Sequence, residues 1–169
     1  MIKFNTYKYQ IPSKNPVAFS GKLDSAEKMV KDIKLSNLYG TSDLGKVKIN
    51  GKTFDVQSVG ENYFSINDKK KQLGFIITSN REYNGKTCCS VAELRNMSEE
   101  NGIGTKLMQM AYKAHKDSGK TGEFRAHEVL LEAEEFYEKL GLVEDTKRAA
   151  QWYLPFENEH ILEQKYGGL

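Results

Sequence analysis

The pattern of hydrophobic and polar positions changes character near the middle of the chain. Between about residues 47 and 94, short apolar runs alternate with polar positions and are separated by turn signals, which is typical of strands. After residue 98, apolar side chains recur every three or four positions in two segments, which is typical of amphipathic helices. The sequence therefore predicts an antiparallel meander followed by a region that alternates helix and strand.

The first half contains one predicted helix and several short strands. Helical spacing predicts a helix over residues 24–38, which Asp24 or Ser25 can cap and Gly40 ends. Asn50-Gly51 lies between two apolar-polar runs, and this pair favours the positive φ angles of a two-residue hairpin. Further strands are predicted over residues 63–66, 73–78 and 87–94, with turns at Asn67-Asp68 and Asn84-Gly85.

The second half alternates a glycine turn, a helix, a strand and a second helix, which is the order that gives a parallel crossover. The inner stripe of the first helix consists of Ile103, Leu107, Met110, Ala111 and Ala114. A strand is predicted over residues 122–127. The stripe of the second helix consists of Val129, Ala133, Phe136, Tyr137 and Leu140, and Gly141 ends it. The prediction ends with strands over residues 142–145 and 150–154 and a short terminal helix or tail over residues 157–166.

Length and composition favour one soluble globular domain. The chain has 169 residues, of which 38% are hydrophobic and 28% charged, and we expect a single domain over residues 21–169 after a poorly ordered lead-in over residues 1–20. No apolar run has the length of a membrane span, and the N-terminus lacks the pattern of a secretory signal. A cytoplasmic location is the expectation that follows.

Charge and cysteine content limit the chemistry that the chain supports. Residues 1–60 carry ten lysines and arginines against five acids, whereas residues 121–169 carry five against eleven. No basic block with interleaved aromatic residues appears, so nucleic-acid binding is a minority interpretation. Cys88 and Cys89 are adjacent and are expected to be buried free thiols, and the scattered histidines show no metal-ligand spacing.

The turn Gly102-Ile103-Gly104 precedes the first helix of the second half. A glycine turn that begins a helix gathers unpaired backbone N–H groups at the positive end of the helix dipole, which suits an anion. Gly102 and Gly104 leave the backbone open to a phosphate, and Thr105 adds a hydroxyl. No Walker loop is present, because Gly104-Thr105-Lys106 has the reverse order. No dinucleotide fingerprint is present either, because Lys106 and Leu107 stand where a third glycine is expected. Spacing alone favours a plain turn.

Two motifs at matching spacing resemble the GCN5-related N-acetyltransferase family over about residues 71–155. ENGIGTKLM (100–108) is similar to the family turn that wraps the pyrophosphate of acetyl-CoA. AEEFYEKLGLVED (133–145) is similar to the family's A-x-x-x-Y-x-x-x-G-F/L segment. The resemblance implies an α/β fold with a mixed, mostly antiparallel central sheet flanked by helices and splayed at the cofactor site. Glu99, Asn96 and Leu130 depart from the usual family residues, which are Arg or Gln, Pro, and Asn.

The resemblance also implies a cofactor and the residues that hold it. Acetyl-CoA is the expected co-substrate, held by the backbone of the turn and by main-chain groups near Leu94 that pair with the pantetheine like an added strand. The turn residues are Glu100, Asn101, Gly102, Ile103, Gly104 and Thr105. The expected reaction is direct transfer of the acetyl group to a primary amine within a ternary complex. The acceptor is a small-molecule or peptide amine, and the oligomeric state, a homodimer included, stays open.

Three residues are candidates for the proton transfers of this reaction. By its family position Tyr137 is the expected acid for the departing thiolate, although its place on the apolar stripe also suits a core residue. Glu93 and His127, with Glu128 beside it, are candidates for the base that frees the amine. A surface ion pair for Glu93 and a strand-end role for His127 are the structural alternatives. An inactive binding or interaction module that kept the fold is the alternative function.

Overall fold

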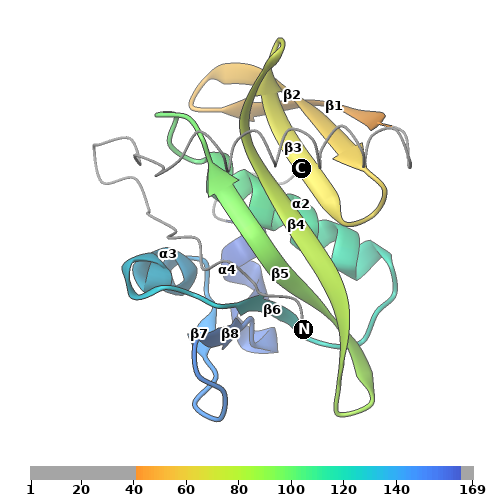
Figure 1. The fold of residues 1–169 in the computed structure, drawn as a ribbon, viewed down its shortest axis with the longest axis vertical. Coiled ribbons are helices and arrows are strands. Elements are labelled where there is room, and N and C mark those ends of the chain that lie inside the picture. Colours follow the sequence, from red (N-terminus) through yellow and green to blue (C-terminus); the bar gives the residue numbers. More distant parts are fainter. Residues whose placement is uncertain (1–40, 165–169) are drawn as a thin grey trace, which may run out of the picture.

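The computed structural model describes residues 41–164, which form a mixed, mostly antiparallel sheet with helices packed against it (Figure 1). One sheet contains eight strands in the order β1-β2-β3-β4-β5-β6-β8-β7. The fold class predicted from the sequence is confirmed. The strands are β1 (Thr41–Ile49), β2 (Lys52–Val59), β3 (Tyr63–Asp68), β4 (Lys71–Tyr83), β5 (Lys86–Asn96), β6 (Phe124–His127), β7 (Val143–Glu144) and β8 (Gln151–Tyr153). The predictions for residues 1–20 and 24–38 lie outside the described residues.

Two predicted hairpin turns are confirmed. Asn50 and Gly51 have φ angles of 50° and 81°, and Asn84 and Gly85 have φ angles of 51° and 72°. Both residues of each turn therefore lie in the left-handed region, as a two-residue turn between right-twisted strands requires. These turns set the register of β1 with β2 and of β4 with β5.

The turn predicted at Asn67-Asp68 is wrong, because β3 continues through both residues. Asp68 pairs with Lys71, and the turn falls on Lys69, whose φ angle is 55°, and Lys70. Asn67 is buried and its Nδ2 donates to Ser65 Oγ at 3.2 Å. That side-chain bond within β3 explains why a residue type that favours turns stays in the strand.

Helix α2 (Ile103–Asp117) packs on one face of the sheet, behind β4 and β5 in Figure 1. The side chains of Ile103 and Leu107 are 0% exposed. A Cβ atom at Gly74 of β4 would lie 2.6 Å from Ile103 Cγ2 and 2.6 Å from the carbonyl oxygen of Arg95. Only glycine at this position lets the first turn of α2 approach β4 so closely, and this contact fixes where the helix begins.

Strand β5 parts from β6 after a β-bulge. Ile77 pairs with Glu93 and Thr78 pairs with Val91, so Ala92 is an extra residue on β5. On its other side β5 pairs with β6 in parallel from Cys89 to Val91, and within residues 41–164 no pair joins the two strands beyond that point. The sheet is therefore splayed beside the last residues of β5, which confirms the predicted splay.

The second predicted helix is shorter than its apolar stripe suggested. Residues Leu131–Ala133 form a 3-10 turn, η1, and helix α3 covers only Glu134–Lys139. Glu128 has a φ angle of 53°, and the N–H of Val129 donates to the carbonyl of Ala150 at 3.0 Å, so the chain before η1 is not helical. Gly141, with a φ angle of 88°, ends the segment as predicted. The last described elements are η2 (Phe156–Asn158) and α4 (Glu159–Gln164).

Candidate functional site

The loop between β5 and α2 is held by side chains on both sides. Asn96 Oδ1 accepts hydrogen bonds from the N–H and the hydroxyl of Ser98, both at 3.0 Å. Asn96 Nδ2 donates to the carbonyl of Glu100 at 3.2 Å, and the N–H of Glu100 donates to Ser98 Oγ at 3.3 Å. Asn96 therefore fixes the conformation of the loop through its side chain.

The β1–β2 hairpin clamps the same loop from outside. Lys52 Nζ lies 2.5 Å from the Glu100 carboxylate, and Asn50 Nδ2 donates to it at 3.2 Å. Asn50 Nδ2 also lies 2.9 Å from the carbonyl of Asn101. The hydrogen bonds from Lys52 and Asn50 lower the pKa of Glu100, so this carboxylate is ionised and neutralised by its partners at neutral pH. No sequence signal linked Asn50 and Lys52 to this loop, because about fifty residues separate the two.

Helix α2 begins with its positive end uncompensated. Gly102, with a φ angle of 92°, is the N-cap, and the first intrahelical bond runs from the N–H of Lys106 to the carbonyl of Gly102 at 3.0 Å. The N–H groups of Ile103, Gly104 and Thr105 therefore have no acceptor within the helix. No side chain caps this end and no acidic residue lies in the first turn. Such a helix start favours an anion.

The side chains of the predicted turn divide between core and surface. Ile103 is 0% exposed and Thr105 is 6% exposed, so both pack in the core and the buried Thr105 hydroxyl is not the surface group that the sequence suggested. Glu99 and Asn101 are exposed. A Cβ atom at Gly104 would lie 3.4 Å from Phe136 Cζ, which shows that this part of the turn faces α3.

Tyr137 lies close to the turn through its neighbour in α3. Its ring packs edge-on against Phe136, with 5.2 Å between the ring centroids, and Phe136 in turn faces Gly104. Tyr137 is 5% exposed and belongs to the hydrophobic core, as its place on the apolar stripe predicted. The structure therefore brings Tyr137 and the glycine turn into the same region, from positions more than thirty residues apart.

Glu93 and Leu94 follow the bulge in β5 and point to opposite faces of the sheet. Leu94 is 7% exposed and belongs to the core cluster that contains α2. Glu93 Oε1 lies 2.5 Å from Arg95 Nε on the other face. The ion pair considered for Glu93 is present, with the buried Arg95 guanidinium on its own strand rather than a surface lysine.

His127 lies at the end of β6, across the splay from the end of β5. Its Nε2 atom lies 3.1 Å from the hydroxyl of Tyr83, at the far end of β4. Burial, together with the positive charges of Arg81, Arg125 and Arg148, lowers the pKa of His127 to about 4. The imidazole is therefore neutral at pH 7. Glu128, the next residue, is exposed.

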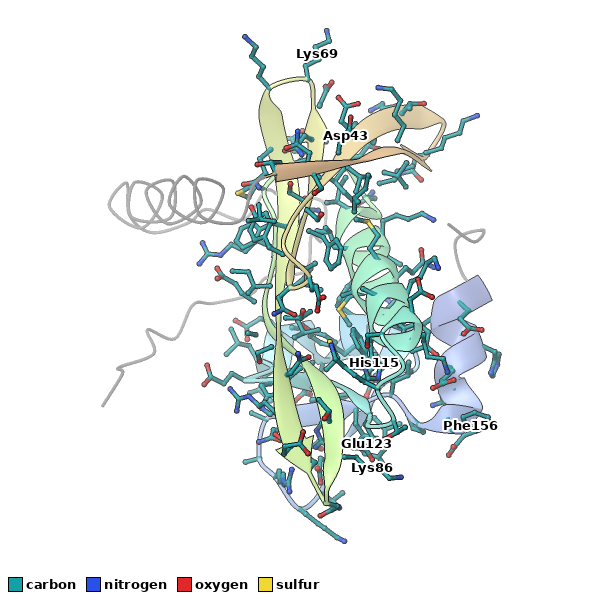
Figure 2. All side chains as sticks on the ribbon, turned by 90° about the vertical axis from the view of Figure 1, so that its right-hand side faces the viewer. Asp43, Lys69, Lys86, His115, Glu123 and Phe156 are labelled. Atoms are coloured by element: carbon teal, nitrogen blue, oxygen red, sulfur yellow. The ribbon has the colours of Figure 1, made fainter. Side chains whose placement is uncertain are left out.

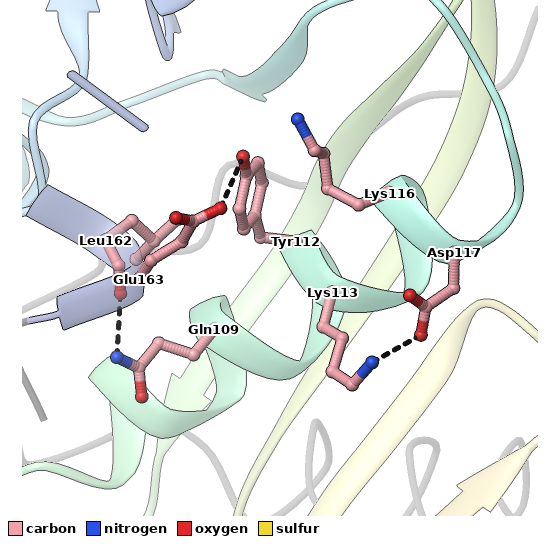
Figure 3. Close-up of a pocket in the computed structure, with 7 residues that line it drawn as sticks. All are labelled: Gln109, Tyr112, Lys113, Lys116, Asp117, Leu162 and Glu163. Atoms are coloured by element: carbon pink, nitrogen blue, oxygen red, sulfur yellow. Dashed lines mark hydrogen bonds and ion pairs between the residues drawn. The ribbon is translucent and has the colours of Figure 1, made fainter. Parts of the chain in front are cut away.

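The described residues also include two cysteines and a pocket that lie apart from these side chains. Cys88 and Cys89 are free and buried, as predicted, and burial raises the pKa of Cys89 to about 11. A cavity of ≈ 290 Å³ lies between α2 and α4 and includes no predicted site residue (Figure 3). Within residues 41–164 no cluster of His, Cys, Asp and Glu side chains could hold a metal ion. In that same part of the chain, no helix is both long and apolar enough to cross a membrane.

Comparison with known proteins finds distant structural similarity only. No family model matches the chain, and no curated protein matches it. The solved structure of Arabidopsis thaliana Naa50 in complex with the bisubstrate analogue CoA-Ac-MVNAL is similar at a TM-score of 0.40 and 17% identity. The match covers 54% of this chain and 68% of that one. A similarity this low decides neither the family nor the function of the chain.

Proposed function

We propose that this protein is an acetyl-CoA-dependent N-acetyltransferase. The observation that carries the proposal is the helix start at Gly102, which has no capping side chain and no acid in its first turn, directly after a strand that bulges and leaves its neighbour. The uncapped helix start suits a pyrophosphate, and the gap between the two parted strands suits an extended ligand that lies between them. Of the two sequence motifs that resemble the N-acetyltransferase family, ENGIGTKLM falls on this helix start and AEEFYEKLGLVED falls on α3 and β7.

In this proposal the cofactor follows the path that the turn and the splay define. The N–H groups of Ile103, Gly104 and Thr105 bind the pyrophosphate, and Glu100 and Asn101 shape the loop. The pantetheine lies along the end of β5 near Leu94, with the thioester at the splay. Acetyl-CoA is a co-substrate here, and the acceptor is a small-molecule or peptide amine. A cytoplasmic location and a single domain over residues 21–169 belong to the same proposal.

The chemistry requires one bond exchange and two proton transfers. The neutral amine attacks the thioester carbonyl, a C–N bond forms, and the C–S bond breaks to release the thiolate of CoA. Tyr137 donates its phenolic proton to that thiolate, since a phenol of pKa near 10 is protonated at neutral pH. The proton lost by the amine leaves on the face that carries Glu93 and His127. With a pKa of about 4, His127 is a weak base and passes the proton on to solvent.

A second candidate function is a binding module without catalysis. It is favoured by the ion pair of Glu93 with Arg95 and by the low pKa of His127, which leave this face without a strong base. The module would bind an acyl-CoA, or a protein partner, without turnover of any amine.

The test is calorimetric titration of the protein with acetyl-CoA, followed by thiol release in the presence of an amine panel. Acetyl-pantetheine, which lacks the nucleotide and its pyrophosphate, is the matched ligand. We expect saturable binding of acetyl-CoA and at least tenfold weaker binding of acetyl-pantetheine, because charge-assisted hydrogen bonds contribute roughly 1.5–3 kcal/mol each. Equal affinity for both would contradict the anion site. Binding without turnover of any amine would support the module instead.

A further inference from the structure

A row of polar side chains crosses four strands on the face of the sheet opposite α2. Ser79 pairs with Ser90, Ser90 with Arg125, and Arg125 with Tyr153. Ser90 is 1% exposed and Arg125 is 4% exposed, so the row is buried. The neighbouring residues of β6, Phe124 and Ala126, belong instead to the core that contains α2. A polar row on a buried face needs partners for its donors and acceptors.

Several of these polar groups lack partners. Ser79 Oγ, Arg125 Nε and Gln151 Oε1 are buried and make no hydrogen bond. Arg125 is otherwise well satisfied, since its NH1 atom lies 2.5 Å from Glu123 and its NH2 atom contacts Asp145. Gln151 pairs with His127 at the splay. These unpaired atoms are buried and out of reach of a ligand, so ligand binding on this face falls to its more exposed arginines.

Two further arginines stand beside this row without a carboxylate. The Arg148 guanidinium lies 4.3 Å from the centroid of the Tyr83 ring, and Arg125 lies 4.8 Å from the same centroid. Arg81 is exposed, two positions before Tyr83 on β4. Among the described residues, neither Arg81 nor Arg148 has an acidic side chain within ion-pair distance, in contrast to Arg125. All three positive charges act on His127, whose pKa they lower in addition to the effect of burial.

This cluster lies beside the splay, where the proposed reaction takes place. His127 is the last residue of β6, at the splay, and Arg125 lies two residues earlier, about 7 Å along the strand. In Figure 2 the labelled residues Lys86 and Glu123 mark this end of the molecule, opposite Asp43 and Lys69. The charges of Arg81 and Arg148 act on His127, so both arginines belong to the side of the splay that carries this base candidate.

We propose that Arg81, Tyr83, His127 and Arg148 bind a carboxylate of the acceptor, so that the substrate is an amine that carries a nearby acidic group. This inference rests on the proposed acetyl transfer. Arginine can form paired hydrogen bonds with one carboxylate. Arg125 instead contacts one oxygen of Glu123 and one of Asp145, whereas Arg81 and Arg148 have no carboxylate within ion-pair distance among the described residues, although the Asp145 charge acts on Arg148. Acidic amino acids and peptides with an acidic residue beside the amine are the two sources of such a group.

The experiment compares matched acceptors on the full chain. The first pair is a four-residue peptide amide with glutamate at its second position and the same peptide with glutamine there. The second pair is free glutamate and free glutamine, which separates the two sources of the carboxylate. Thiol release with saturating acetyl-CoA gives kcat and KM for each. We expect KM for the acidic member of at least one pair to be roughly tenfold lower than for its amide, with little change in kcat.

The variants are Arg81→Gln and Arg148→Gln, and Lys86→Gln is the control because it removes an exposed positive charge from the same hairpin. Each arginine variant should raise KM for the acidic acceptor about five- to tenfold and leave KM for the amide unchanged. Lys86→Gln should change neither. Thermal unfolding of each variant verifies that it is folded. Equal KM values within both pairs, or equal effects on acid and amide, would overturn the inference and leave acetyl transfer standing.

A second measurement separates this inference from the proposed function. If no amine is acetylated, the acidic and amide peptides are titrated into the protein with CoA present, and the His127 ring is followed by NMR. A bound carboxylate near Arg81, Arg125 and Arg148 offsets their charge, so the pKa of His127 should rise from its value of about 4. A rise with the acidic peptide alone would support the carboxylate site. No change with either peptide would overturn it.

Discussion

Helices α2 and α3 begin side by side in the fold and are built in opposite ways. Helix α2 begins at a glycine, with no capping side chain and no acidic residue in its first turn. Helix α3 begins with Glu134 and Glu135, whose negative charges compensate the positive end of its own dipole. Phe136 of α3 faces Gly104 of α2, so the two starts share one region.

In the proposed function, this difference assigns ligand binding to the start of α2 and catalysis to α3. The start of α2 leaves its N–H groups to an external anion. The acidic residues at the start of α3 compensate its own dipole, and α3 places Phe136 and Tyr137 in the same region as the start of α2. A negative ligand at α2 therefore has a hydrophobic wall beside it, and in the proposed function that wall carries the proton donor. Four changes test this division, from the largest expected effect to the smallest.

The largest effect is expected on turnover. Tyr137→Phe removes only the phenolic hydroxyl, so it should lower kcat by about 10²–10⁴-fold while the affinity for acetyl-CoA stays unchanged. Thiol release and calorimetry measure the two quantities. The neighbouring Phe136→Leu is the control that alters the same wall without removing a proton donor. Normal turnover in Tyr137→Phe would refute the assigned role.

The second effect is expected on cofactor binding. The change gives the first turn of α2 an acidic residue, as α3 has. Gly104→Glu places an acid in the first turn of α2, where like charges oppose a pyrophosphate by several kcal/mol, so acetyl-CoA affinity should fall by about a hundredfold or more. Gly104→Gln has the same size without the charge and should fall much less. Calorimetric titration of both variants gives the comparison. Equal losses would mean that bulk against Phe136, and not charge, decides binding.

The third effect is on stability and concerns the shape of the turn. A Cβ atom at Gly102 would lie 3.1 Å from Ile49 Cγ2, and its φ angle of 92° is unfavourable for any other residue. Gly102→Ala should therefore cost about 1–3 kcal/mol of unfolding free energy and also weaken acetyl-CoA binding. Gly119→Ala, at a φ angle of 70° with nothing within 4 Å, should show a smaller cost and no loss of binding. Urea unfolding provides the values.

The smallest effect is expected at α3. Glu134→Gln removes one compensating charge from its first turn and should lower the unfolding free energy by about 0.3–1 kcal/mol. Acetyl-CoA affinity should not decrease, because this carboxylate contributes no binding. A clear loss of affinity would show that α3 takes part in cofactor binding through its acidic start.

The sequence predicted the elements whose signals are local. Asn50-Gly51 and Asn84-Gly85 identified their hairpins because a two-residue turn needs positive φ angles, and the stripe from Ile103 predicted α2 because one helix face is buried. Prediction failed where a particular hydrogen bond outweighed the propensity of the residues. Asn67 stays in β3 through its bond to Ser65, and the N–H of Val129 pairs with Ala150, so the helix begins later than its stripe.

The candidate site shows the same division. The glycine turn and Tyr137 could be selected from motifs, because the spacing of each motif can be read directly from the sequence. The clamp of Asn50 and Lys52 on Glu100 could not, since β1 and β2 meet the loop only in the folded sheet. The cluster of Arg81, Tyr83 and Arg148 was equally hidden, because its members come from β4 and the turn between β7 and β8.

By itself the sequence determined which segments are strands and helices, the mixed sheet, the glycine turn, and that the cysteines are free and buried. These features follow from backbone preferences and from the burial of one face, which act over a few residues. Only the tertiary structure decided that β5 bulges at Ala92 and leaves β6 after Val91, that α3 faces the start of α2, and that His127 lies among arginines. These features depend on strand register and on charges brought together from distant positions, which no local pattern of residues records.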